Sequence, residues 1–300
     1  MTTAVYTAPR GVVAPIFTPF ADSGEIDTSL FIDHALDMLN AGCVALAPFG
    51  TTGEGTSLSS NERIDALAAL IAAGVDPAML VPATGLPSLT ETAALSKACV
   101  DLGCAGVMTL PPYYYKTAPD DGLYAYFEQL IDRVGAPDLR IYLYHIPQIA
   151  GVGLSVDLVR RLFADFDEVV AIKDSSGDLA NTEALLGIDG LAVYPSAESA
   201  LGRVLPLGAP GCITASANLV AGPIARLIEA WDRDPEEAAT LQPAVTASRL
   251  AIQGHPLIEG QKRAKALISG DDRWANVRPP LTPYGADAAA ALARDLGLLT

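Results

Sequence analysis

Short hydrophobic runs alternate along the chain with longer segments in which hydrophobic residues recur at helical spacing. Because hydrophobic runs of this length are typical of strands buried on both faces, the alternation predicts an α/β protein with a parallel sheet. We expect eight strands, near residues 12–17, 43–47, 79–83, 106–110, 140–144, 169–173, 191–194 and 211–214. Eight strand–helix units predict a closed (β/α)8 TIM barrel.

Capping residues mark the beginning of the first three expected helices. These are Asp27 or Thr28 before residues 30–39, Ser59 or Ser60 before 62–73, and Ser88 or Thr90 before 91–102. After the eighth strand the pattern is helical throughout, with helices expected over 224–231, 235–252, 259–268 and 286–296. We therefore predict a catalytic barrel domain, residues 1–231, and a C-terminal helical region, residues 232–300, packed on it.

Composition and charge narrow the classes of partner. Half of the 300 residues are hydrophobic, which is enough for a large core, and 35 acidic against 19 basic residues give a net charge of −16. Nucleic acids and anionic membranes are poor partners for such a chain, whereas a small anion can still bind at local donors. The first residues do not resemble a signal peptide and no long uninterrupted apolar segment follows, so we expect a cytoplasmic protein that does not bind membranes.

The spacing of the cysteines and histidines gives little support for a metal site or for redox chemistry. The cysteines and histidines are scattered, without Cys-x-x-Cys or His-Glu-x-x-His spacing; they are Cys43, Cys99, Cys104, Cys212, His34, His145 and His255. We predict reduced, buried thiols and no metal site. A zinc-dependent aldolase would need a cluster of such ligands, so the pattern favours a lysine-based mechanism.

Lys173 is the strongest candidate for catalysis. It ends the hydrophobic run 169–172, and the polar segment 174–177 follows at once, so its amine is expected where a buried strand opens into a loop. Burial favours the neutral form of an amine, and only a neutral amine attacks a carbonyl to form a Schiff base. The other four lysines lie in helix-like or polar surroundings and are expected on the surface; they are Lys97, Lys116, Lys262 and Lys265.

The position of Lys173 has two other interpretations. A lysine after a strand can simply extend its ammonium group to the solvent, and the local sequence alone gives that alternative about even odds. The string Val-Ala-Ile-Lys also matches the ATP-binding strand of protein kinases. However, no glycine-rich loop precedes it and neither His-Arg-Asp nor Asp-Phe-Gly follows, so a kinase is excluded.

Further candidate groups follow other strands. Alternation along the strands places Val169, Ala171 and Lys173 on one face, and pairs Tyr142 with Tyr144, whose phenol is then expected to face Lys173. The loop at residues 50–55 offers two threonine hydroxyls and backbone N–H groups that suit a carboxylate. An ordinary polar turn is the alternative there. The run at 111–115, Pro-Pro-Tyr-Tyr-Tyr, would by itself indicate packing or an interface.

At these residues the chain resembles the dihydrodipicolinate synthase and N-acetylneuraminate lyase family, which are lysine-dependent aldolases that use or release pyruvate. The resemblance covers nearly the whole chain. The motifs are GTTGE at 50–54, PPYYY at 111–115, YxxP at 144–147, IKDSSG at 172–177 and GCITASAN at 211–218. It implies a (β/α)8 barrel with a C-terminal helical extension, a homo-oligomer (tetramer or dimer), and neither a metal nor an organic cofactor.

The resemblance also implies roles for individual residues. Lys173 would form the imine with a 2-oxo acid, and Tyr144 would act as general acid and base. Thr51 would join the proton relay, and Tyr114 would complete it from a neighbouring subunit. Substrate contacts would come from Thr51, Thr52, Gly53, His145, Ser196 and Ile213, although a structural role for His145 is equally compatible with its position.

Departures from the family pattern bear on the substrate. The synthases usually carry an arginine two residues after the YxxP proline, where this chain has Ile149, and this loss removes an anion partner. We therefore expect a class I 2-oxo-acid aldolase that cleaves a 4-hydroxy-2-oxo acid, such as a 2-keto-3-deoxy sugar acid, into pyruvate and an aldehyde. The alternatives are 4-hydroxy-tetrahydrodipicolinate synthase, a sugar-acid dehydratase, and a non-catalytic barrel that binds a keto acid.

Overall fold

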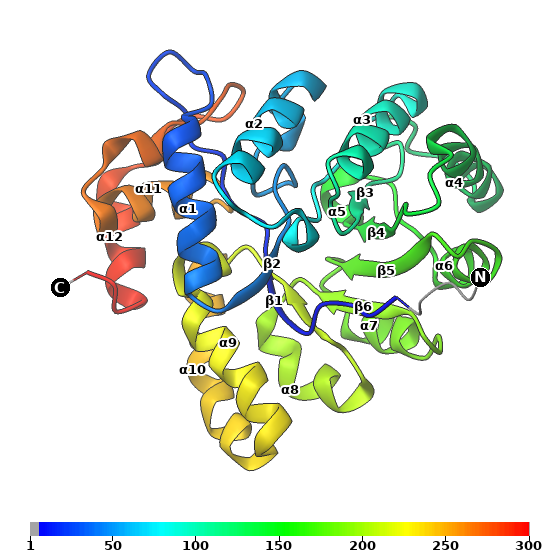
Figure 1. Ribbon diagram of the computed structural model, residues 1–300. Helices are drawn as coiled ribbons and strands as arrows, with labels where there is room; N and C mark the ends of the chain where they lie inside the picture. The colour runs from blue at the N-terminus through cyan, green and yellow to red at the C-terminus, as the bar shows by residue number, and fades with distance from the viewer. Residues whose placement is uncertain (1–5, 300) are drawn as a thin grey trace.

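Short parallel strands form the inner wall of the protein (Figure 1). The computed structural model describes residues 6–299. Its strands are β1 (Gly11–Ala14), β2 (Cys43–Leu46), β3 (Val107–Thr109), β4 (Ile141–His145), β5 (Val169–Asp174), β6 (Ala192–Pro195) and β7 (Gly211–Ile213). They are hydrogen-bonded in the orders β2-β1-β7 and β3-β4-β5-β6, and every pair is parallel.

The strand expected over 79–83 is less regular than predicted. A 3-10 turn occupies Pro77–Met79, and the chain beyond it forms only isolated bridges, to β2 and to β3. Val81 N donates to Leu46 O at 2.8 Å, and Met108 N donates to Pro82 O at 2.9 Å, so this segment joins the two sheets. Pro82 has no N–H to donate, which explains why a continuous ladder does not form.

The side chains that point inward show that the wall is a barrel. Strand β6 lies next to β7, so the eight segments follow one another around a closed (β/α)8 wall. Each contributes a buried residue to one central cluster. In chain order these are Val13, Ala45, Val81, Met108, Tyr142, Ala171, Tyr194 and Ile213.

A register shift in β5 changes one expectation about which side chains face inward. Val169 pairs with Ile141, but the next pair is Ala171 with Tyr142, so Val170 is an extra residue in the ladder. Val169 consequently packs in the outer core between the barrel and the helices, whereas Ala171 packs inside the barrel. The expectation that both share the face of Lys173 was wrong for Val169.

Helices cover the outside of the barrel (Figure 1). They are α1 (Thr28–Asn40), α2 (Ser60–Ala72), α3 (Leu89–Asp101), α4 (Asp120–Val134), α6 (Val156–Asp165), α7 (Leu179–Leu186), α8 (Leu201–Val204) and α9 (Ala217–Arg233). The short helix α5 (Pro147–Ala150) follows directly after the carboxyl end of β4. The expected caps are confirmed at Asp27, Ser59 and Ser88, each of which accepts a backbone N–H of its helix.

The C-terminal part is helical, as expected. It contains α10 (Pro235–Gln253), α11 (Glu259–Ser269) and α12 (Ala286–Asp295). Helix α9 begins before the expected residue 224. Its backbone is non-helical at Val220, and Pro223 lies inside the helix, which continues beyond this kink. Helix α10 packs along α9 and reaches the segment after β6, so it lies over one edge of the barrel. A domain boundary near residue 232 remains a prediction.

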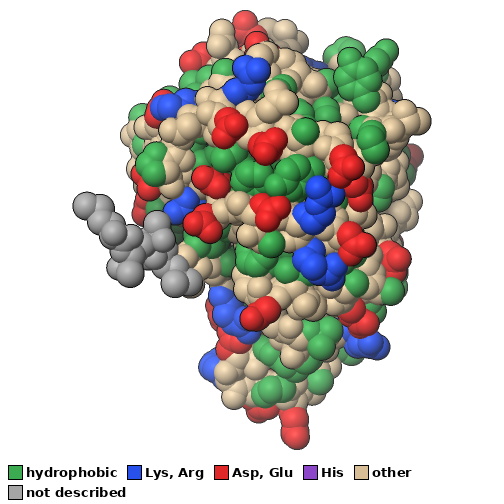
Figure 2. Space-filling view, turned by 90° about the vertical axis from the view of Figure 1, so that its right-hand side faces the viewer, with side chains coloured by type: hydrophobic (Ala, Val, Ile, Leu, Met, Phe, Trp, Pro, Cys, Tyr) green, Lys and Arg blue, Asp and Glu red, His purple; other side chains and the backbone are tan. Residues whose placement is uncertain are grey.

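The burial of the cysteines and the side chains on the surface can be compared with the expectations from composition. All four cysteines are buried free thiols, as predicted. Figure 2 shows acidic and basic side chains interspersed with hydrophobic ones over one face. Among residues 6–299, no helix has both the length and the apolar character that a membrane span requires.

Candidate active site

Lys173 and Tyr144 lie side by side at the carboxyl ends of β5 and β4. The parallel register pairs these two residues directly, and the Lys173 Nζ lies 4.3 Å from the centre of the Tyr144 ring. Both side chains are almost fully buried, at 4% and 2% exposure. The expected approach of the phenol to the lysine is therefore confirmed in the structure.

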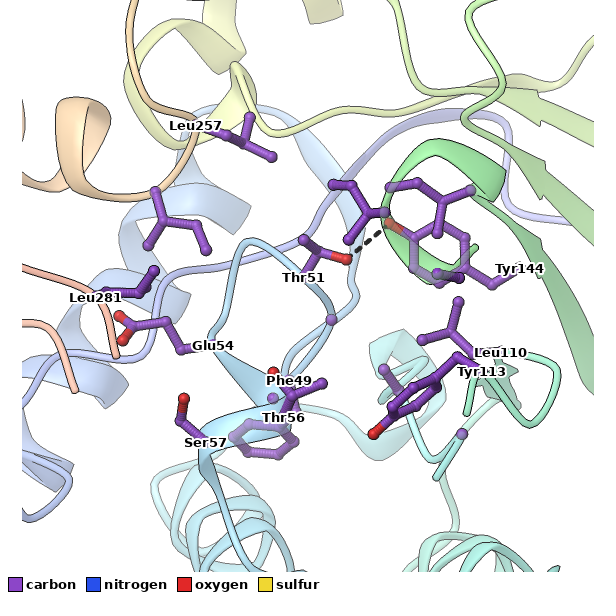
Figure 3. A pocket seen from close by; sticks show the side chains of 18 of the residues that line it. Phe49, Thr51, Glu54, Thr56, Ser57, Leu110, Tyr113, Tyr144, Leu257 and Leu281 are labelled. Atoms are coloured by element: carbon purple, nitrogen blue, oxygen red, sulfur yellow. Dashed lines mark hydrogen bonds between the residues drawn. The ribbon is translucent and has the colours of Figure 1, made fainter. Parts of the chain in front are cut away.

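Thr51 extends this pair. Its Oγ1 lies 3.2 Å from the Tyr144 hydroxyl oxygen, and Figure 3 shows the two side chains facing one another. The loop that holds Thr51 is tightly folded, since Phe49 and Glu54 both adopt left-handed backbone conformations, with φ of 63° and 52°. A continuous line of functional groups therefore runs from Lys173 through Tyr144 to Thr51.

Lys173 lines a cavity of about 190 Å³ at this end of the barrel. Thr51 and Thr52 form part of its wall, Ser196 and Ile213 another part, and Ile149 a third. Helix α10 and the segment after it close the cavity with Arg249, Gln253 and Leu257. Lys173 and Arg249 are the charged residues in this lining, which contains no carboxylate from the described chain.

A larger cavity of about 460 Å³ lies beyond Thr51 and Tyr144, which also contribute to its wall (Figure 3). Its lining is mostly apolar and includes Phe49, Leu110 and Tyr113. Lys173 is not part of this lining. Because chemistry at an imine must take place at the amine, the smaller cavity is the candidate active site.

Three of the expected site residues do not line the lysine cavity. His145 lies on the strand face opposite to Tyr144, and its Nδ1 accepts the backbone N–H of Leu154 at 2.9 Å. Gly53 packs tightly, since a Cβ there would lie 2.8 Å from the carbonyl oxygen of Ile16. Tyr114 is 75% exposed, and its ring packs edge-on against Tyr115. These positions give His145 and Gly53 structural contacts within the subunit.

Lys262 corrects the expectation that all other lysines lie on the surface. Its side chain is fully buried, and its Nζ donates to Glu54 Oε1 at 2.6 Å and to Thr18 O at 2.9 Å. Burial lowers the pKa of Lys262, and the Glu54 carboxylate opposes this shift. Lys173 differs because its Nζ has no hydrogen bond or ion pair within residues 6–299. Lys262 is committed to an ion pair, while Lys173 is available to react.

Comparisons with known proteins show the family of this chain. The model of the dihydrodipicolinate synthetase family matches residues 8–298. The chain belongs to this family. It is therefore an enzyme of a lyase family.

Relatives and solved structures span nearly the full chain. An uncharacterized DapA-like lyase of Chloroflexus aurantiacus is 32% identical over 95% of both chains. A 4-hydroxy-tetrahydrodipicolinate synthase of Synechococcus elongatus is 31% identical over 96% of this chain and 97% of its own. The crystal structure of dihydrodipicolinate synthase from Agrobacterium tumefaciens superposes with a TM-score of 0.87 at 32% identity, covering 96% of this chain and 99% of that one.

In this member of the dihydrodipicolinate synthetase family, the C-terminal region also contributes residues to the cavity wall. The sequence did not predict this contribution. Arg249 and Gln253 lie four residues apart on α10, and Leu257 follows that helix. Nothing in the local pattern distinguishes Arg249 from a surface arginine of an amphipathic helix. Only the packing of α10 over the barrel brings its side chain, which is 13% exposed, to the cavity.

No metal site is visible in the described part of the chain. Within residues 6–299, no three His, Cys, Asp or Glu side chains are grouped closely enough to hold a metal ion.

Proposed function

We propose that this protein is a class I 2-oxo-acid aldolase that forms a Schiff base through Lys173. Its substrate is a 4-hydroxy-2-oxo acid, which it cleaves to pyruvate and an aldehyde or forms from them. The observation that carries the proposal is the buried amine of Lys173, unpaired within the described residues and 4.3 Å from the Tyr144 ring, inside a cavity. Neither a metal nor an organic cofactor is required by this chemistry.

Imine formation begins the reaction. The Nζ lone pair of Lys173 attacks C2 of the substrate, and loss of the C2 oxygen as water leaves a protonated imine. The imine carbon C2 is joined to C4 through C3, so the positive imine nitrogen can accept the electrons of the C3–C4 bond. Thr51 and Thr52 line the same cavity, where their hydroxyl groups suit the C1 carboxylate of the substrate.

Tyr144 supplies the proton transfers that follow. It accepts the proton of the C4 hydroxyl group while its own phenolic proton passes to Thr51 Oγ1, 3.2 Å away, and Thr51 releases its hydroxyl proton to the solvent. The electrons of the C3–C4 bond then move into the imine, so that the aldehyde leaves and an enamine remains. Protonation of the enamine at C3 and hydrolysis of the imine release pyruvate and restore the free amine.

Assembly and location are part of the proposal. Tyr114 is 75% exposed and lies outside its own cavity, which is compatible with a role in a neighbouring subunit of a homotetramer or dimer. A cytoplasmic location, with small 2-oxo acids and aldehydes as partners, agrees with the acidic chain. The related Escherichia coli protein YagE, 25% identical over 96% of this chain and 99% of its own with a TM-score of 0.87, was crystallised in complex with pyruvate.

A second candidate function is 4-hydroxy-tetrahydrodipicolinate synthase. It is supported by the Synechococcus elongatus relative of that name, which matches over nearly the whole chain. The same imine would then react as an enamine with an amino-acid aldehyde, and ring closure would follow. A cyclic product from pyruvate and such an aldehyde would identify the synthase, and loss of water from a sugar acid without cleavage would identify a dehydratase.

Borohydride trapping tests the imine directly. Wild-type protein reduced in the presence of pyruvate is expected to gain one pyruvate-derived adduct per chain, mapped by peptide mass spectrometry to Lys173. Protein treated with borohydride alone is the control. An adduct that maps to Lys97 or Lys116, or no adduct at saturating pyruvate, contradicts the proposal and leaves the non-catalytic binding barrel.

Tyr144→Phe tests the proton transfer separately from imine formation. The variant retains the ring beside Lys173 but loses the hydroxyl group, so kcat is expected to fall about 10²- to 10³-fold. Pyruvate should still be trapped on Lys173, which shows that the cavity is intact. A variant that cleaves substrate at the wild-type rate would exclude Tyr144 as general acid and base.

A further inference from the structure

We propose that Arg249 binds a second anionic group of the substrate, so that the natural substrate is an acid at both ends. This inference rests on the proposed function, because it takes the imine at Lys173 as the anchor of the first end. It extends that function by naming the substrate class, a 4-hydroxy-2-oxo diacid. Cleavage of such a compound gives pyruvate and an aldehyde that carries a carboxylate.

The charge of the cavity points to an anionic ligand. The protein has a net charge of −16, yet the described lining of the Lys173 cavity contains two basic residues and no acidic one. Lys173 carries a positive charge once the imine is protonated, and the guanidinium group of Arg249 is charged throughout, with the buried Glu198 3.7 Å behind it. A wall with these two cations and no carboxylate favours a ligand with more than one negative group.

The contacts of Arg249 leave part of its guanidinium group available. Nη1 donates to Ser196 O at 3.4 Å, and the buried Nε has no hydrogen-bond partner. A buried donor without a partner is costly, and a carboxylate bound side-on would satisfy Nε together with a terminal nitrogen. Arginine provides this planar pair of donors, which lysine does not.

Glu198 forms an ion pair with Arg249 but does not accept a hydrogen bond from its guanidinium group. Its Oε2 lies 3.7 Å from Arg249 Nη1, which is too long for a hydrogen bond, and accepts the hydroxyl of Thr214 at 2.6 Å. The carboxylate of Glu198 is fully buried behind the cavity and is not part of its wall. We infer that Glu198 orients the guanidinium group while other donors remain free for the substrate.

A second polar group lies on the same side of α10. Gln253 follows Arg249 by four residues, so both side chains project from one face of the helix, and both line the cavity. Ile149, which α5 contributes to the same lining, has no polar group to offer. The substrate's far carboxylate is therefore expected to bind against α10.

Aldehyde selectivity tests the role of Arg249. Condensation of pyruvate is measured with an acidic aldehyde, glyoxylate, and with glycolaldehyde, a neutral aldehyde of the same chain length. The wild type is expected to prefer glyoxylate in kcat/KM. In Arg249→Met, kcat/KM for glyoxylate should fall about 10- to 100-fold, mainly through KM, while that for glycolaldehyde changes less than about threefold.

Rescue and control variants separate binding from folding. Arg249→Met with Ile149→Arg places a cation at another position of the same lining and should restore part of the preference for glyoxylate. Arg160→Met, an exposed arginine of α6, is the matched control and should behave as wild type. Each variant is first trapped with pyruvate on Lys173, because adduct formation shows that the fold and the imine site are intact.

The outcomes distinguish the two proposals. Trapping in all variants, with the glyoxylate preference lost only when Arg249 is replaced, supports both. Trapping in all variants with equal use of the two aldehydes by the wild type, or with an unchanged preference in Arg249→Met, overturns the role of Arg249 alone. Absence of the adduct in the wild type overturns the aldolase function, and the role of Arg249 falls with it.

Discussion

Lys173→Ala is expected to lower the rate of carbon–carbon bond cleavage on the order of 10⁴-fold or more and to abolish the borohydride-stable pyruvate adduct. The reason is that the imine is the only electron sink in the proposed reaction. Lys173→Arg should be equally inactive, because a guanidinium group retains its charge but does not form an imine with the substrate. Steady-state cleavage and mass spectrometry measure the two effects independently.

Lys97→Ala is the matched control for this substitution. Lys97 is an exposed lysine on α3 that pairs with Asp101, so its loss should leave both activity and adduct unchanged. A Lys173→Ala protein that still cleaves substrate at more than about a tenth of the wild-type rate would refute the Schiff-base mechanism. If that protein has lost turnover but still binds pyruvate at equilibrium, the lysine is catalytic and the carboxylate contacts are independent of it.

The pairing of Lys173 with Tyr144 was predictable from the sequence because it depends on local order. Each residue ends a hydrophobic run, and consecutive parallel strands place their carboxyl ends at the same end of a barrel. The capping residues were predictable for the same reason, since Ser59 and Glu62 form their capping box within one helical turn. A structural feature that is determined by residues close to one another in the sequence can be predicted from the sequence alone.

Features that depend on register or on distant packing were not predictable. The extra residue Val170 in β5 turns Val169 to the outer core, and hydrophobic alternation cannot show this because both sides of the strand are buried. Lys262 and Arg249 look like surface residues of helices, yet one is fully buried and the other lines the cavity. In both cases a C-terminal helix crosses to the barrel, and no short motif records that approach.

The ion pair between Glu54 and Lys262 connects these distant parts to the active site. Glu54 follows Thr51 and Thr52 by only a few residues, and its Oε2 also accepts the backbone N–H of Arg278 at 3.0 Å. Through this carboxylate, the threonine loop is joined to α11 and to the segment that precedes α12. Both charged groups are fully buried, so each depends strongly on its ion pair with the other.

Removing one partner of this pair is expected to destabilise the protein strongly. Lys262→Met leaves the Glu54 carboxylate buried without its cation, and should lower the free energy of unfolding by about 3–5 kcal/mol. The exposed pair of Lys97 and Asp101 is the control, and Lys97→Met should cost less than about 0.5 kcal/mol. Urea unfolding at pH 7 measures both.

The double variant Glu54→Gln with Lys262→Met should recover part of this loss, because neither charge remains buried alone and glutamine can still accept the N–H of Arg278. We expect it to be at least about 1 kcal/mol more stable than the sum of the two single effects predicts. Its kcat should remain below that of the wild type, since the loop that carries Thr51 has lost its ionic anchor to α11. Additive losses in the cycle would mean that the two residues stabilise the fold independently, and an unchanged kcat in a folded double variant would remove the ion pair from the positioning of Thr51.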